Sequence, residues 1–349
     1  MFTSYEFSSY KSIASNPLIH KSLKKASYYL EHYNNALQSH NKKQALLLPL
    51  LIAETIISLK IPFSITQLAH LFNDKPDSLW IDYLHTLIYL TNHHNKQSLN
   101  ISKLCFLHRL IKYNSSVKGS LGILRTQQNW IGPEGCGIEK AYFLPPSPEE
   151  VPSLVNKWIS FFNTSTAYPL IQLALAYGQF LVIHPFMDGN GRIARLLIPW
   201  FLHQHKLLIK PIFCPSDYFS KHRKEYCKRL FDLSSDLAWI KWINFFLKAL
   251  TSQAKKQTQL MNQLALLYQQ LAKQLNGQIS HSEIHQLLDF CFCQPIFEKA
   301  RFPFAREIHI LQKLGLLQQH KDSFLFIPVV SYLKKITSKK FISRLSFKN

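Results

Sequence analysis

The chain has few acidic residues and lacks the cysteine spacing of a metal or redox site. Lys and Arg number 41 against 20 Asp and Glu, which gives a formal net charge of +21 over 349 residues. This excess favours polyanionic partners such as nucleotides, nucleic acid or anionic membrane, although lysines spread along the chain are also typical of a surface that only maintains solubility. None of the six cysteines forms a Cys-x-x-Cys pair, which indicates free thiols in a reducing compartment.

A long uninterrupted apolar run is also missing. The most apolar stretch, ALLLPLLIAETIISL at 45–59, contains Pro49 and Glu54. It is shorter than the roughly 20 residues that a membrane-spanning helix needs. The first residues lack the basic segment and apolar run of a secretory signal. We therefore predict a buried helix at 45–59, no membrane span and a cytoplasmic location, with export that needs no N-terminal signal left open.

Helical periodicity dominates the chain, so the fold class that we predict is mainly α. Apolar spacing predicts helices at 16–40, 45–59, 64–72, 77–93 and 100–113, whereas the Gly- and Pro-rich segment 132–148 indicates an exposed hairpin or flap. The composition shifts toward Gln and Lys after residue 250, which favours a linker helix into a last domain. That domain has a helix, a break at Gly315 and two β-prone runs, the outline of a winged helix-turn-helix. The expected parts are 1–99, 100–250 and 251–349.

Residues 184–195 read HPFMDGNGRIAR and stand between two apolar runs. The second run has helical spacing, so DGNG predicts a tight turn at a helix N-terminus. The first backbone N–H groups of a helix have no intrahelical partner, and glycines let another group approach them closely, so the turn predicts an anion site. Arg192 and Arg195 are three residues apart and share a helix face, where two guanidinium groups would suit a polyphosphate.

Two further side chains of this motif point to group-transfer chemistry. Asp188 fits a site for anions if its carboxylate holds Mg²⁺ and the metal bridges to phosphate oxygens. His184 lies just upstream, and an imidazole takes a proton from an attacking hydroxyl at neutral pH. The set predicts a base, a metal ligand, a phosphate-binding turn and two cationic clamps, which together favour nucleotide-dependent transfer of a phosphate-containing group.

On these residues the sequence resembles the Fic (filamentation induced by cAMP) family. HPFMDGNGRIAR fits the family motif HxFx[D/E]GNGRxxR at every fixed position. GSLGILRTQQNWIG, LPPSPEEVPSLVNKWISFFN and SDYFSKHRKEYCKRLFDL resemble the segments before the family's flap, after it and downstream of the motif. The resemblance covers about residues 100–250. It implies a Fic-type helical core with a β-hairpin flap, and adenylylation, in which AMP moves from ATP to a Ser, Thr or Tyr hydroxyl of a target protein and pyrophosphate is released.

The resemblance also implies a role for each residue of the motif. His184 would be the general base, Asp188 would hold Mg²⁺, and Arg192 and Arg195 would hold the distal phosphates. The turn residues that would cradle the α- and β-phosphates are Gly189, Asn190 and Gly191. The flap, at about 132–146, would pair with the backbone of the protein target as an added strand.

The expected adenine pocket departs from the family pattern. Tyr226 matches the first of two tyrosines that line this pocket in some members. The second tyrosine is replaced by Cys227, and a following Asn corresponds to Ser234. These departures leave the preferred nucleobase open.

An inhibitory helix is a second family feature with a partial match. The family pattern is [S/T]xxxE[G/N], whose Glu pairs with the second motif arginine. LLIAET at 50–55 supplies Glu54, but Leu50 replaces the hydroxyl residue and Thr55 the Gly or Asn. Glu54 is the only charge in the apolar stretch 45–59, and a buried carboxylate needs a partner, for which Arg195 is suited. The alternative is an ordinary Glu at a helix edge facing water.

The leading prediction is thus a protein adenylyltransferase with ATP, Mg²⁺ and a protein target as partners. Removal of AMP by the same site, or transfer of another phosphate-containing group, stays open. A DNA- or RNA-binding regulator is the alternative of a different class, supported by the net charge and by the basic tail after residue 299.

Overall fold

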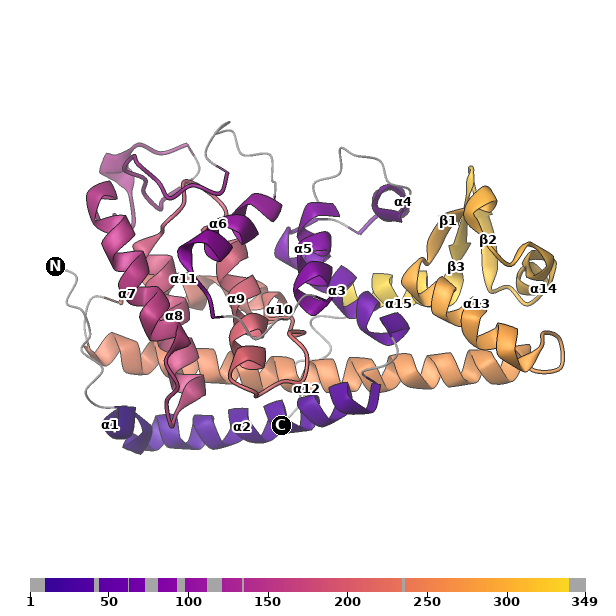
Figure 1. The fold of residues 1–349 in the computed structure, drawn as a ribbon, viewed down its shortest axis with the longest axis horizontal. Helices are drawn as coiled ribbons and strands as arrows, with labels where there is room; N and C mark the ends of the chain where they lie inside the picture. Colours follow the sequence, from indigo (N-terminus) through magenta and orange to yellow (C-terminus); the bar gives the residue numbers. More distant parts are fainter. Residues whose placement is uncertain are drawn as a thin grey trace. The chain divides into compact units, whose positions relative to one another are not determined.

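The structure is a computed structural model that describes residues 10–40, 44–61, 63–72, 81–92, 98–111, 121–133, 135–233 and 236–338. Its elements divide between two compact units, drawn in Figure 1, and neither unit is a continuous piece of chain. Unit 1 comprises Met1–Leu37 with His85–Lys256, and unit 2 comprises Gln38–Leu84 with Gln257–Asn349. The expected division into consecutive parts at 1–99, 100–250 and 251–349 therefore differs from the observed one, because the N-terminal region is shared between the units.

Unit 1 is helical and is built around one uncharged and mostly apolar helix, α8. Nearly every side chain of α8 is buried, and α7 and α9 both pack against it. A helix without charges and with apolar residues on all its faces belongs in the interior of a protein, which explains why the run before the motif lies there. The helices that lie wholly or mostly in unit 1 are α1 (Tyr10–Ser15), α2 (Pro17–His40), α5 (Ile81–Asn92), α6 (Ile101–Leu110), α7 (Val151–Asn163), α8 (Pro169–Ile183), α9 (Asn190–Gln204), α10 (Ser216–Lys221) and α11 (Arg223–Phe231).

Two tryptophans hydrogen-bond to backbone carbonyls of α8. Trp158 donates its indole N–H to the carbonyl of Ala176 at 2.8 Å, and Trp242 donates to the carbonyl of Ala174 at 2.7 Å. A Cβ at Gly178 would lie 2.9 Å from the rings of Trp239 and Trp242, so only glycine allows this close approach. The end of α8, where the motif begins, is thereby held in a fixed place within unit 1.

Unit 2 combines helices with a small antiparallel sheet. The strand order is β1-β3-β2, with Leu317 opposite Phe326 and Ile296 opposite Leu325. The apolar helix α3 packs against α13 and α15, which is why residues 38–84 group with the C-terminal residues. The elements of unit 2 are α3 (Gln44–Ser58), α4 (Ile65–Phe72), α13 (His281–Cys293), β1 (Ile296–Glu298), α14 (Ile308–Lys313), β2 (Leu317–His320), β3 (Ser323–Phe326) and α15 (Ile327–Thr337).

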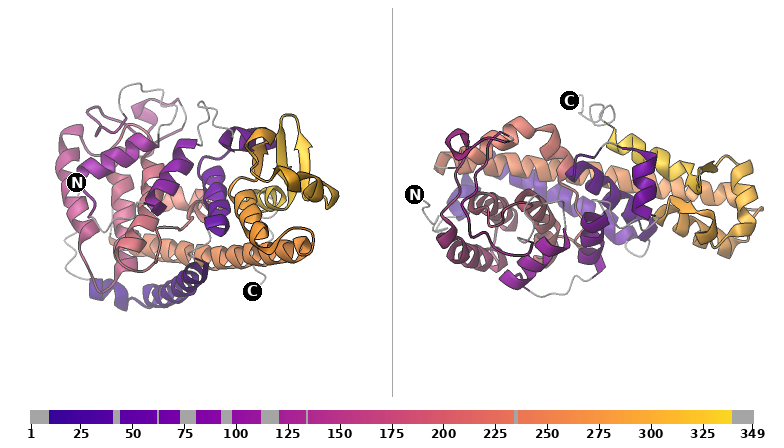
Figure 2. Two further views of the ribbon diagram at one scale, coloured as in Figure 1. Left: turned by 45° about the vertical axis from the view of Figure 1, so that its right-hand side comes forward. Right: turned by 90° about the horizontal axis from the view of Figure 1, so that it is seen from above.

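One helix, α12 (Asp236–Leu275), runs without interruption through the residues of both units, as both views of Figure 2 show. The sequence predicted only its second half, as a linker helix after residue 250. None of the described helices is both long enough and apolar enough to cross a membrane. The mainly α fold and the helical segments expected upstream of residue 113 are confirmed where the structure describes them.

Candidate active site

His184 is placed by the abrupt end of α8. Its backbone N–H still donates to Phe180 at 3.0 Å, but its own φ of 50° lies in the left-handed region, which ends the helix and turns the chain. Left-handed conformations of residues other than Gly cluster at functional sites, because the surrounding structure has to hold them there. Residues 184–191 begin at this point, and we name them the catalytic turn for the role that we propose for them.

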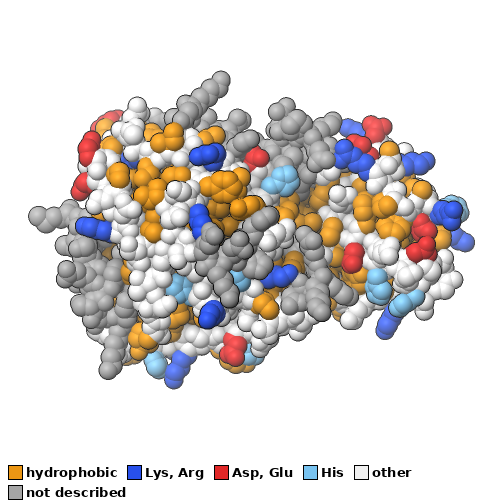
Figure 3. Space-filling model, viewed as in Figure 1, with side chains coloured by type: hydrophobic (Ala, Val, Ile, Leu, Met, Phe, Trp, Pro, Cys, Tyr) orange, Lys and Arg blue, Asp and Glu red, His pale blue; other side chains and the backbone are white. Residues whose placement is uncertain are grey.

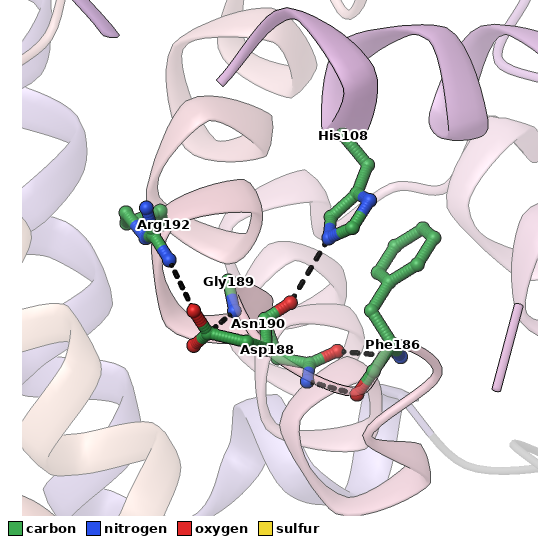
Figure 4. A network of polar contacts seen from close by, with 6 residues as sticks. All are labelled: His108, Phe186, Asp188, Gly189, Asn190 and Arg192. Carbon is green, nitrogen blue, oxygen red and sulfur yellow. Dashed lines mark hydrogen bonds and ion pairs between the residues drawn. The ribbon is translucent and has the colours of Figure 1, made fainter. Parts of the chain in front are cut away.

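Asn190 closes the catalytic turn from inside. Its side-chain oxygen accepts the N–H of Phe186 at 2.9 Å, and its side-chain nitrogen donates to the carbonyl of Phe186 at 2.7 Å (Figure 4). The side chain is 2% exposed. Asn190 therefore shapes the turn through its amide group, while its backbone stands at the start of α9.

His108, on α6, supports the turn from outside. The backbone N–H of Gly122 donates to its Nδ1 at 2.9 Å, so the other nitrogen, Nε2, carries the proton and donates to the carbonyl of Asp188 at 2.9 Å. The imidazole stacks on Phe186 with 3.8 Å between ring centroids and 3° between planes. Burial lowers the pKa of His108, which favours the neutral form that this bonding pattern requires.

Two more side chains hold the turn from the segment before the flap. Arg125 donates from Nε to the carbonyl of His184 and from its backbone N–H to the carbonyl of Pro185, both at 2.9 Å. Asn129 donates from its side chain to the carbonyl of Phe186 at 3.0 Å. Both side chains are buried. The carbonyls on this side of the turn are thus occupied by fixed donors.

The imidazole of His184 is prepared to accept a proton. Its Nδ1 lies 3.1 Å from the carbonyl of Leu181, which can only accept, so Nδ1 carries the hydrogen and Nε2 keeps its lone pair. Burial, followed by the positive charge of Arg125, lowers the pKa of His184 to about 4, against an opposing effect of the Leu181 contact and of Asp188. His184 is therefore neutral at physiological pH, as a general base must be.

The N-terminus of α9 has the backbone geometry that the predicted anion site requires. Gly189 precedes the helix with a φ of 80°, and the first helical hydrogen bonds are those of Arg192 and Ile193 to the carbonyl of Gly189. The backbone N–H groups of Asn190 and Gly191 come before these bonds, at the positive end of the helix dipole. A Cβ on Gly189 would lie 3.3 Å from His108 and 3.3 Å from Ile111, so the turn leaves little room for a side chain there.

The charged residues of the motif gather at this helix end. Asp188 accepts the backbone N–H of Gly189 at 2.6 Å and pairs with Arg192 at 2.8 Å (Figure 4). The guanidinium of Arg195 lies beside Gly191, 3.3 Å from where a Cβ on that glycine would be. The structure thus brings together His184, Asp188, Arg192 and Arg195 around one turn, as the motif predicted.

Tyr226, on α11, lies in an aromatic cluster of the same unit. Its hydroxyl is 2.9 Å from that of Tyr177, and its ring is 5.0 Å from that of Phe219. Burial raises the pKa of Tyr226 to about 12, so the hydroxyl stays protonated. Its role in adenine binding stays a prediction, as do the consequences of the departure at Cys227; the departure at Ser234 lies outside the described residues.

Glu54 is buried, at 2% exposed, so the alternative of an ordinary carboxylate facing water is excluded. It lies in α3 of unit 2, between the equally buried Leu50 and Thr55. Thr55 donates its hydroxyl to the carbonyl of Leu51 at 2.9 Å, which is an ordinary contact within a helix. The pairing of Glu54 with Arg195 stays a prediction.

Three residues of this site were not found from the sequence: His108, Arg125 and Asn129. Each lies outside the motif, and each acts on a backbone carbonyl rather than in a recognisable pattern. Arg125 had the clearest available signal, a cation that closes the otherwise uncharged stretch SLGILR.

Comparison with known proteins places the motif in a described family. Residues 98–202 match the model of the Fic/DOC family. Protein adenylyltransferase Fic of Drosophila melanogaster is 29% identical over 131 residues, which cover 36% of this chain and 24% of that protein. Protein adenylyltransferase Fic of Aedes aegypti is 34% identical over 86 residues, 24% of this chain and 16% of that protein. The matches thus span about a quarter or less of the length of these relatives.

Solved structures share the fold over a longer part of the chain. A Fic family protein from Desulfovibrio desulfuricans G20 superposes with a TM-score of 0.59 at 16% identity, over 89% of this chain and 96% of that one. A Fic domain containing signaling protein from Bacteroides thetaiotaomicron VPI-5482 gives a TM-score of 0.50 at 19% identity, over 70% of this chain and 96% of that one. At these identities the likeness concerns the fold alone.

Proposed function

We propose that this protein is an adenylyltransferase that moves AMP from ATP to a hydroxyl of a target protein. The match of residues 98–202 to the Fic/DOC family is the premise of this proposal. The observation that carries the proposal is the imidazole of His184. It is neutral and fixed through Nδ1, and it begins the turn that leads into a helix N-terminus suited to phosphate. A base next to an anion site is the minimum that hydroxyl attack on a nucleotide requires.

In this reaction Nε2 of His184 accepts the proton of the target hydroxyl. The hydroxyl oxygen forms a bond to the α-phosphorus, the bond from that phosphorus to the bridging oxygen breaks, and pyrophosphate leaves with the electron pair. The backbone N–H groups of Asn190 and Gly191, with Arg192 and Arg195, would hold the phosphate oxygens as negative charge shifts toward the leaving group.

The residues present fit a magnesium ion that is bound chiefly through the nucleotide. The part of the chain that the structure describes holds no group of three or more His, Cys, Asp or Glu suited to a metal. Asp188 is the one carboxylate of the motif, and its side chain is 52% exposed. Mg²⁺ often binds one or two carboxylates and completes its shell with phosphate oxygens and water. Asp188 would then exchange Arg192 for the metal, which would neutralise phosphate charge and free Arg192 for the nucleotide.

The flap supplies a surface for the target. Residues 132–142 are closed by a single antiparallel bridge between Ile131 and Phe143, so the expected hairpin is reduced to one bridge. Several large apolar side chains of this part of the chain are exposed: Ile123, Trp130, Ile138, Tyr142 and Leu144. Apolar side chains also gather at the upper left of Figure 3, where the flap lies in Figure 1. Exposed apolar patches mark interaction surfaces, which supports docking of a protein segment here.

Labelled ATP tests the proposal directly. The protein should transfer label from [α-³²P]ATP, and not from [γ-³²P]ATP, to protein in a lysate. His184→Ala should lower this transfer by at least about a thousandfold while ATP binding stays within about twofold, because the base acts on the hydroxyl and the turn holds phosphate. Release of AMP from modified protein without transfer would favour the reverse reaction, and labelling from a different nucleotide would favour another transferred group. Transfer by His184→Ala at the wild-type rate would refute the role of His184 as the base.

A second candidate function concerns the C-terminal residues of unit 2. Their order, α13–β1–α14–β2–β3, is that of the expected helix and hairpin, and exposed cations lie between β1 and β3. These are Lys299, Arg301, Arg306, Lys313 and Lys321. We propose duplex DNA binding through this surface, with affinity that falls steeply as salt rises. Arg306→Glu should weaken it, and affinity that does not change with salt would count against it.

A further inference from the structure

Hydrogen bonds to its carbonyl oxygens hold the catalytic turn in place. Those of His184, Pro185, Phe186 and Asp188 each accept a hydrogen bond from the region 108–129, at distances between 2.9 and 3.0 Å. A hydrogen bond to its carbonyl oxygen fixes the plane of a peptide group, because that group is rigid and planar. The four bonds therefore orient this stretch of backbone, including the base that begins it.

Arg125 supplies two of these bonds and reaches further than the other donors. Its Nε donates to His184 at 2.9 Å, and one terminal nitrogen donates to the carbonyls of Pro146 at 2.5 Å and Ile183 at 3.4 Å. The residue is 3% exposed, and the acceptors of its guanidinium hydrogen bonds are all backbone carbonyls. One planar, rigid group thus touches the end of the flap and the peptide of the base at once.

The charge of Arg125 has its own effect on the site. A guanidinium stays protonated inside proteins, so a permanent positive charge lies against the carbonyl of His184. A positive charge disfavours a second one nearby, which opposes formation of the imidazolium. Asp188 is the other charged group that acts on this imidazole, and it acts in the opposite sense.

We infer that Arg125 is a positioning residue for His184, which ties the base to the end of the flap and keeps it neutral by charge. The inference rests on the proposed function, since it concerns the base of that reaction. The planar fork of N–H donors on the guanidinium of Arg125 sets the position of the His184 peptide. The positive charge of the same group favours the neutral form of the imidazole. Movement of Pro146 when a target binds along the flap would reach the base through this one side chain.

Substitutions separate the fork from the charge. Arg125→Lys keeps the charge and loses the planar fork, whereas Arg125→Met loses both. Gln128→Met is the matched control, because the side chain of Gln128 donates to the neighbouring flap carbonyl of Pro145 at 3.0 Å and to the carbonyl of Asn129, neither of which belongs to the catalytic turn. Transfer rate, ATP affinity and the acid titration of the His184 ring are measured for each, the last by NMR of ¹⁵N-histidine-labelled protein with the signal assigned by its loss in His184→Ala.

Arg125→Lys should lower kcat by at least about tenfold with ATP affinity within about twofold, because the loss falls on orientation and not on phosphate contacts. Arg125→Met should in addition move the titration of His184 upward by about one pH unit, since a removed charge no longer opposes protonation. Gln128→Met should leave both quantities near those of the wild type. If Arg125→Met fails to fold, the lysine variant alone decides the role of the fork.

The inference is overturned if Arg125→Lys transfers at the wild-type rate, or if the titration of His184 is the same in Arg125→Met. It is also overturned if ATP affinity and kcat fall together, which would indicate a general loss of structure. A wild-type protein that transfers no AMP would refute the proposed function alone, because the NMR titration still reports whether Arg125 acts on His184.

Discussion

The catalytic turn and the flap lie in the same unit but are built in opposite ways. In the turn, four carbonyl oxygens are held by hydrogen bonds from outside and Asn190 closes it from within. The flap is closed by one bridge, between Ile131 and Phe143, and exposes large apolar side chains. Chemistry on a nucleotide needs atoms fixed within fractions of an ångström, whereas recognition of varied protein segments needs an accessible surface. The difference supports the proposal that the turn carries the chemistry and the flap binds the target.

Breaking the turn should have the largest effect. Asn190→Ala removes both bonds to Phe186 and leaves its buried backbone N–H without that acceptor, at a cost of about 1–3 kcal/mol, while the carbonyl of Phe186 keeps the bond from Asn129. We expect transfer to fall by at least about a hundredfold, because small misplacements of reacting groups are costly. Asn163→Ala is the control, since Asn163 holds the peptide of Leu99 with the same pair of bonds, at 3.0 and 2.8 Å. We expect similar melting temperatures for the two variants but a much lower transfer rate for Asn190→Ala. Equal transfer rates in the two variants would contradict the role of Asn190.

Removing one charge at the turn should have a smaller effect. Asp188→Asn can still accept the N–H of Gly189 but is a poorer ligand for a hard cation. We expect transfer to fall by about ten- to a hundredfold at fixed Mg²⁺, with part of the loss regained at higher Mg²⁺. Titration of Mg²⁺ against transfer rate for both proteins is the measurement. An unchanged Mg²⁺ requirement would give Asp188 some other role.

Changing the flap should affect the target and not the nucleotide. Tyr142→Ser and Leu144→Ser remove apolar surface that is 65% and 54% exposed. The KM for the target should rise by about three- to tenfold for the pair of changes, with ATP affinity unchanged. Leu266→Ser, at a position that is also 54% exposed but lies on α12 in unit 2, is the control. A rise in KM for ATP would show that the two regions are less separate than proposed.

The pH dependence of transfer should show the smallest change. Because the pKa of His184 is lowered to about 4, the base stays neutral as the pH falls. Transfer should vary by less than about twofold between pH 7.5 and pH 5.5, whereas an ordinary histidine would lose about tenfold. A rate profile in buffers of constant ionic strength measures this. A midpoint of the rate–pH profile near the ordinary pKa of histidine would mean that the bound nucleotide restores the basicity of the His184 ring.

The sequence predicted the position of the residues that we propose to meet the nucleotide better than it predicted the residues that hold them in place. The motif placed His184, Asp188 and Arg195 correctly at one turn because its residues are neighbours in the chain, so local geometry decides their arrangement. His108 and Arg125 reach the turn from positions far upstream, and only tertiary packing brings them there. For Asn190 the sequence predicted the position in the turn but not the role of the side chain, which binds the backbone of Phe186 and shapes the turn.

The boundaries between parts of the chain were less predictable. The composition shift after residue 250 suggested a new element, yet α12 begins at Asp236 and continues to Leu275. No Gly or Pro interrupts that stretch, and a helix continues where nothing breaks it. The grouping of 38–84 with the C-terminal residues depends on contacts of α3 with α13 and α15, which no local pattern encodes.

The packing of α3 has a consequence for truncation and protein quality control. Deleting residues 280–349 removes α13 and α15, the two helices against which α3 packs. The buried side chains of α3 are mostly apolar, among them Leu46, Leu50, Ile52 and Ile56, each under 4% exposed, and the deletion removes helices that cover this helix. Uncovered apolar helices self-associate and are recognised by chaperones and proteases. A premature stop codon in this C-terminal stretch would therefore lower the amount of protein in the cell, although every residue of the motif would still be translated.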